Sequence, residues 1–103
     1  MISVTISRSL DGNISGFEVK GHGEASLVCP AVSLLTLNTV NSIEALTKAS
    51  FNCDHDPEGG YLKMELKSHC PEAQLLLKSM ALGLHSLKET YSKDIKLKDQ
   101  KEG

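Results

Sequence analysis

Apolar and polar residues alternate along the first part of the chain, which is typical of half-buried β-strands. Residues 2–6 carry isoleucine or valine at every second position, with serine and threonine between them. Residues 17–20 alternate in the same way, and the turn-forming run 11–13 (Asp-Gly-Asn) separates the two segments. We therefore predict a hairpin, and the same alternation places His22 on the polar side at the end of its second strand.

From Pro30 the apolar spacing becomes helical and remains so to about Thr47. Apolar residues lie on most sides of the first half, which predicts a helix that is central in the fold or shared with a second subunit. Proline suits the first helical position because its missing N–H has no intrahelical partner there. This places Cys29 at or next to the N-cap.

The second half of the chain repeats this order. A short strand over residues 51–54 and a turn over 56–60 precede an alternating strand over 62–66. A second helix runs from Pro71 to near Tyr91, and Ile95 and Leu97 predict a last edge strand. The order ββαββα with a final β indicates an α+β fold, in which two helices pack on a small antiparallel or mixed sheet.

Composition limits the classes of function. The chain has 103 residues, 40% hydrophobic and only 4% aromatic, which predicts a single domain over 1–103 with an aliphatic core. A net charge of −2 argues against direct nucleic-acid binding. We find no signal-peptide pattern, and no run of the roughly 18 apolar residues that a membrane span needs. With an odd number of cysteines, three, these features predict a cytoplasmic protein with reduced thiols and no membrane contact.

The candidate chemistry lies in residues 21–30, where a histidine at a strand end and a cysteine at a helix start are joined by a short loop. A thiol is a weak nucleophile until it ionises, and both a helix N-terminus and a nearby imidazole favour the thiolate. The free N–H groups of a helix start also suit an oxyanion. Cys29 is therefore a candidate nucleophile and His22 its base. The alternative, a small packed cysteine and an idle surface histidine, stays open on these residues alone.

The segment GH…LVCPAVSLLTLNTVNSIEAL resembles the ribosomal-processing cysteine protease family. It is similar in the Gly-His pair at a strand end, in Val-Cys-x-Ala-Val-Ser at a helix start, and in Asn38 and Asn41 of the first helix. The resemblance continues through Gly59-Gly60-Tyr61 to the end of the second helix, so it covers nearly the whole chain.

This resemblance implies that Cys29 and His22 form a catalytic pair with no cofactor or metal. It implies a substrate, the N-terminal extension of a large-subunit ribosomal protein, which is cut after a pair of aromatic residues. It also implies a homodimer. The residues expected to bind substrate or support the pair are Gly21, Gly23, Ser26, Val28 and Ser33.

Two positions depart from the family pattern. Only six residues separate His22 from Cys29, and Ser26 stands where members usually carry an aspartate shortly before the cysteine. Glu24 is one hypothesis for a substitute acid. These departures favour a second interpretation, a non-catalytic ribosome-associated binding module on the same fold. A thiol-transfer protein is disfavoured because Cys29 has no CxxC partner.

Cys53, His55, His69 and Cys70 are candidate zinc ligands, since the two segments would face each other across a hairpin. Their spacings, Cys-x-His and His-Cys, are not those of structural zinc sites, so we predict no metal. Cys53 and Cys70 are predicted to be packed thiols. His85 is predicted to lie at the surface or in an interface.

Overall fold

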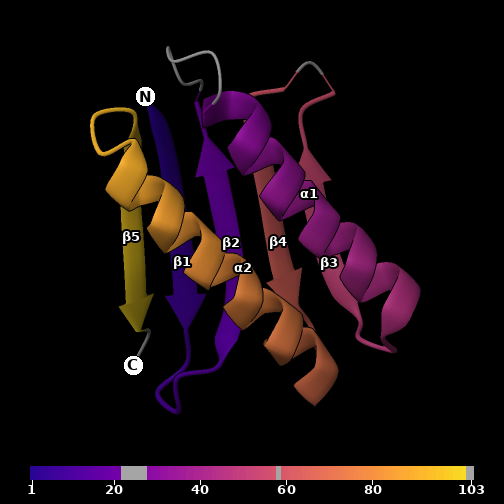
Figure 1. The fold of residues 1–103 in the computed structure, drawn as a ribbon. Helices are drawn as coiled ribbons and strands as arrows, with labels where there is room; N and C mark the ends of the chain where they lie inside the picture. Colours follow the sequence, from indigo (N-terminus) through magenta and orange to yellow (C-terminus); the bar gives the residue numbers. More distant parts are fainter. Residues whose placement is uncertain (22–27, 58, 102–103) are drawn as a thin grey trace.

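The computed structural model describes residues 1–21, 28–57 and 59–101, which form a five-stranded mixed sheet with both helices on one face (Figure 1). This confirms the predicted α+β fold, including its final strand. The sheet order is β3-β4-β2-β1-β5. The elements in chain order are β1 (Ile2–Arg8), β2 (Ile14–Lys20), α1 (Val28–Leu46), β3 (Phe51–His55), β4 (Tyr61–Leu66), α2 (Pro71–Thr90) and β5 (Ile95–Lys101).

The predicted hairpin is present, and its register explains the alternation of residue types. β1 and β2 pair antiparallel with Val4 opposite Val19 and Ile6 opposite Phe17, so that apolar side chains share the helix-covered face. β5 pairs parallel with β1, a connection that needs a crossover, and α2 supplies it. β3 and β5 are the two edge strands of the sheet.

The core lies between the sheet and the helix layer and is aliphatic, as the composition predicts. Phe17 is its one buried aromatic side chain among the described residues. Neither described helix is long and apolar enough to cross a membrane. The largest fully buried side chains include Ile2, Ile6, Ile43, Met64, Leu77, Met80 and Leu84.

The start of α1 differs from the prediction. The helix begins at Val28, not at Pro30, and ends at Leu46. The difference is two residues because a proline is tolerated anywhere its N–H would lack a partner, which includes the whole first turn. Cys29 is therefore inside the first turn. One side of α1 is exposed at Leu34 and Leu46, so this chain alone does not bury the helix on all sides. Of the two predicted alternatives, a helix shared with a second subunit stays a prediction.

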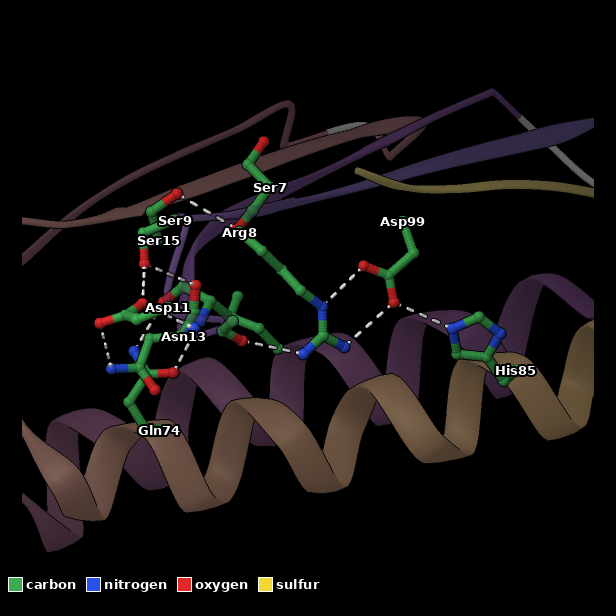
Figure 2. Close-up of polar contacts among 11 residues, drawn as sticks. Ser7, Arg8, Ser9, Asp11, Asn13, Ser15, Gln74, His85 and Asp99 are labelled. Atoms are coloured by element: carbon green, nitrogen blue, oxygen red, sulfur yellow. Dashed lines mark hydrogen bonds and ion pairs between the residues drawn. The ribbon is translucent and has the colours of Figure 1, made fainter. Parts of the chain in front are cut away.

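Gln74 is a buried polar residue of α2 that the sequence did not single out. Its Nε2 donates to the backbone carbonyl of Ile14 at 2.6 Å, and its Oε1 accepts from the Ile14 N–H at 2.7 Å (Figure 2). The β1–β2 register shifts between Ser7 and Arg8, next to this point. The side chain of Gln74 thus supplies hydrogen bonds at a place where the strand ladder is irregular.

A polar cluster joins β1, β5 and α2. Arg8 donates through Nε to Asp99 Oδ1 at 2.7 Å and through Nη2 to Asp99 Oδ2 at 3.0 Å, while His85 Nε2 lies 3.0 Å from Asp99 Oδ2 (Figure 2). The hydrogen bonds from Arg8, with a smaller contribution from His85, hold the pKa of Asp99 below its ordinary value against partial burial. The His85 side chain is half exposed, which agrees with its predicted surface position.

Asp99→Asn is expected to lower the free energy of unfolding at neutral pH by about 1 kcal/mol, the scale of a partly exposed ion pair. Because the folded-state pKa of Asp99 is depressed, its contribution is complete above the unfolded pKa of about 3.9 and is lost as pH falls through the lower folded value. Urea unfolding across an acidic pH series should therefore show the variant converging on wild type below about pH 4. Asp54→Asn, at an exposed aspartate on the other edge strand, is the control. A difference that does not vary with pH would contradict this role.

Candidate active site

α1 starts beside one edge of the sheet, where β2 and β3 finish and β1 and β4 begin (Figure 1). Cys29, in the first turn of α1, therefore lies at this edge. It is partly buried and packs against the core. Beside it is a mostly apolar cleft of about 200 Å³. The lining residues are Ile2, Val19, Gly21, Cys29, Val32, Ser33, Thr36, Leu37, His55, Asp56, Gly59, Gly60, Tyr61 and Leu62.

One face of α1 forms a wall of this cleft. Cys29, Ser33 and Leu37 are spaced four residues apart, so they lie one above another on the helix. The structure thus brings Ser33 and Cys29 to the same cleft, as the spacing predicts. Val28 differs, because its side chain is fully buried in the core and fixes the start of the helix.

Gly21 sets the path of the chain as it leaves β2. Its φ is +89°, a left-handed conformation that side chains other than hydrogen disfavour. Its N–H donates to the carbonyl of Gly60 at 2.9 Å, which links the end of β2 to the β3–β4 turn. A Cβ added at Gly21 would lie 2.5 Å from the carbonyl oxygen of Met1. Glycine is therefore required here for both conformation and space, immediately before His22.

The predicted base is not among the described residues. His22, Gly23 and Ser26, with the hypothetical acid Glu24, all fall within residues 22–27, outside the ranges given above. The pairing of His22 with Cys29 stays a prediction.

His55 and Asp56 line the cleft on the side of β3, although neither residue was predicted to belong to it. The prediction ended this strand at Asp54, whereas β3 extends to His55. In the observed register His55 shares the helix-side face of the sheet with Phe51. Had the predicted strand been extended by one residue, its alternation would have placed His55 on the face of the sheet that the helices cover, the side on which Cys29 lies.

The cysteine and histidine pairs weighed as a zinc site do not face each other. His55 pairs with Leu62 at one end of the β3–β4 ladder, whereas His69 and Cys70 follow the other end of β4. No cluster of three or more such ligands occurs among residues 1–21, 28–57 and 59–101.

The two remaining cysteines have different surroundings. Cys70 is buried, as predicted, but the prediction of a packed Cys53 is wrong, because that residue is exposed on an edge strand. Partial burial of its thiol raises the pKa of Cys53, and the nearby carboxylates of Asp54 and Glu44 add to this shift. Neither residue lines the cleft beside Cys29.

A thiol in the first turn of a helix, on the wall of a mostly apolar cleft, is the arrangement expected of a cysteine protease. The family model described as Cysteine protease Prp matches residues 1–96, and the chain belongs to that family.

Relatives and solved structures agree with this membership. A Staphylococcus aureus protein named ribosomal processing cysteine protease Prp is 28% identical over 103 residues, covering 94% of this chain and 97% of its own. The Bacillus subtilis protein of the same name is 32% identical, with coverage of 94% and 96%. The crystal structure of the S. aureus protease with a covalently linked product peptide superposes with a TM-score of 0.89 at 29% identity, covering 97% of this chain and 100% of that one. A second S. aureus structure, with a substrate peptide, gives a TM-score of 0.90. The binding-module interpretation therefore gives way to an enzyme.

Proposed function

We propose that this protein is a cytoplasmic endopeptidase that removes the N-terminal extension of a large-subunit ribosomal protein, with Cys29 as nucleophile and His22 as general base and acid. The observation that carries the proposal is the position of Cys29, in the first turn of α1 and on the wall of an apolar cleft. The names of the relatives from S. aureus and B. subtilis support the substrate.

In this mechanism His22 takes the thiol proton, and the Cys29 sulfur attacks the carbonyl carbon of the scissile peptide bond. The carbonyl oxygen becomes an oxyanion, which in this proposal the backbone amides at the start of α1 stabilise. The imidazolium then gives its proton to the leaving amine as the C–N bond breaks, and a thioester remains on Cys29. A water molecule, deprotonated by His22, hydrolyses the thioester and restores the thiol.

The remaining predicted residues have supporting roles. Gly21 directs the chain toward His22, and Gly23 and Ser26 belong to the same connection. Ser33 lies one turn beyond Cys29 on the cleft wall, and in this proposal its hydroxyl donates a hydrogen bond to the bound peptide. The cleft volume of about 200 Å³ is large enough for one aromatic ring, since an apolar cavity of about 150 Å³ holds benzene. An aromatic side chain next to the scissile bond therefore fits it.

Alkylation by iodoacetamide tests the proposed pair directly. At neutral pH we expect Cys29 to react faster than Cys53 and Cys70, because a thiolate held near imidazolium is the reactive form. The raised pKa of Cys53 and the burial of Cys70 make both slow internal references. Mass mapping of each alkylated peptide gives the three rates in one sample.

His22→Ala should remove most of the rate advantage of Cys29. His85→Ala should not, because His85 contacts Asp99 and does not line the cleft. Equal rates for Cys29 in wild type and His22→Ala would remove His22 from the mechanism.

We also propose that the protein acts as a homodimer. Large apolar side chains remain exposed on both helices: Leu34 on α1, and Leu75 and Leu82 on α2. Exposed apolar side chains that share one surface mark association sites, and we propose that these do. Sedimentation analysis should give a dimer, and Leu34→Gln with Leu82→Gln should shift it toward monomer, whereas Lys78→Gln should not. A wild-type monomer at micromolar concentration would contradict the proposal.

A further inference from the structure

We infer that the outer edge of β3 (Phe51–His55) is a docking site for an extended segment of the substrate that is rich in lysine or arginine and follows the scissile bond. This segment adds to the sheet as a further strand beside β3. The inference rests on the proposed peptidase function and adds to it a second contact with the substrate, outside the cleft beside Cys29.

The two edge strands of the sheet carry different side chains. β5 presents exposed lysines at Lys96, Lys98 and Lys101, and lysines on an edge strand protect it against pairing with another chain. β3 has the sequence FNCDH, without lysine or proline, and forms the opposite edge of the sheet (Figure 1). Residues 52–55 of this strand are exposed. The edge at β3 is therefore the one that is open to a further strand.

The register of β3 on β4 shows which backbone groups face outward. The N–H of Asp56, just past the strand, donates to the carbonyl of Tyr61 at 3.1 Å. Every second residue of an antiparallel strand makes such bonds to the same neighbour, so within β3 they belong to Asn52 and Asp54. The backbone groups of the alternate residues point away from β4, where an extended peptide can pair with them. These residues are Phe51, Cys53 and His55.

Carboxylates lie on both sides of this edge. Asp54 is on the uncovered face of the sheet, where it lines a polar groove of about 300 Å³ together with Lys63 and Glu65. Lys63, the cation of this groove, is held by Glu65 at 3.1 Å. Glu44 approaches from α1: partial burial raises the pKa of the Cys53 thiol, and the carboxylates of Asp54 and Glu44 add to the shift. These charges favour a docked strand with lysine or arginine at alternate positions.

The position of the edge selects the substrate as its occupant. His55, the last residue of β3, lines the cleft beside Cys29, so a chain that leaves the cleft meets the end of this strand. A second copy of the protein suits the edge poorly, because pairing two β3 strands would bring like carboxylates together. The segment after the scissile bond stays with the mature ribosomal protein, where contact with RNA favours lysine and arginine. Charge and position therefore agree on this part of the substrate.

The test uses two peptides that are identical up to the scissile bond. One carries lysine at alternate positions after the bond, and the other carries glutamine there. Wild type should cleave the lysine peptide with a kcat/KM about two- to tenfold higher, the range for one or two exposed ion pairs, and high salt should reduce the difference. Asp54→Lys should bring this ratio to one or below. Glu89→Lys, the same change of charge at an exposed residue of α2, should keep the wild-type ratio.

Methylated peptides test the backbone pairing. N-methylation of one alternate set of amides in the lysine peptide should abolish its advantage, and methylation of the other set should not, because only every second N–H of a strand faces a given neighbour. Equal effects of the two sets would overturn the addition of a strand. Because the pairing uses backbone groups, Cys53→Ala should retain it.

Binding to an inactive variant separates this inference from the proposed function. The lysine and glutamine peptides are titrated by fluorescence anisotropy against Cys29→Ala, with and without Asp54→Lys. Tighter binding of the lysine peptide that is lost with Asp54→Lys supports the docking edge even if wild type cleaves neither peptide, an outcome that would count against the peptidase mechanism alone. Equal affinities, or a preference for lysine that Asp54→Lys leaves intact, would overturn the inference.

Discussion

Replacing Cys29 by alanine is expected to lower kcat/KM for peptide cleavage by about 10⁴-fold or more, the scale seen when a protease loses its nucleophile. The variant keeps the cleft, the first turn of α1 and His22, but has no atom that can form the thioester. Alanine removes only one sulfur from a partly buried position, so the fold should survive. The measurement is turnover of a peptide with two aromatic residues before a small one, with circular dichroism to establish folding.

Cys53→Ala is the matched control for this experiment. Cys53 is exposed on edge strand β3 and does not line the cleft, so its loss should change kcat/KM by less than about twofold. Binding of uncleaved peptide to Cys29→Ala would show that the cleft is intact. If Cys29→Ala retained cleavage while Cys53→Ala lost it, the active site would lie at Cys53 of β3 and the proposed mechanism would be wrong.

Most of the fold was predictable because alternation and helical spacing report directly which face is buried. Ile2, Val4 and Ile6 alternate in the sequence and are buried in the structure, and the spacing from Ala73 to Leu84 matches the buried face of α2. The position of Cys29 at a helix start was predictable because a proline that follows it marks the first turn, whereas its catalytic role stays a proposal. The exact start of α1 was not, since a proline only limits the first turn and does not select its first residue.

The features that could not be predicted depend on contacts between distant parts of the chain. Gln74 lies 60 residues from Ile14, and only the packed structure shows that an amide on α2 completes an irregular strand. His55 was considered only as a zinc ligand, because its place in the cleft depends on β3 ending beside α1. In both cases a polar residue falls on an apolar face, and a sequence pattern alone does not distinguish this from a break in the element.

Gly21→Ala is expected to lower both stability and activity, because two separate penalties act at this position. A left-handed backbone costs a residue with a Cβ roughly 1–2 kcal/mol. The Cβ would also lie 2.5 Å from the carbonyl oxygen of Met1, and this backbone atom cannot move without shifting the start of β1. Together these predict a loss of about 2–4 kcal/mol in the free energy of unfolding, measured in urea. Cleavage by the folded fraction should also fall, since Ile2 lines the cleft and His22 follows Gly21 directly.

Gly12→Ala separates the two penalties. Gly12 has the same φ of +89° in the β1–β2 turn, but a Cβ there meets nothing within 4 Å, so only the conformational cost of roughly 1–2 kcal/mol applies. The difference between the two variants measures the contact with Met1. Equal costs would mean that β1 relaxes freely, and full activity per folded molecule in Gly21→Ala would mean that this glycine does not position His22. A larger cost together with reduced kcat/KM ties the conformation of Gly21 to the geometry of the active site.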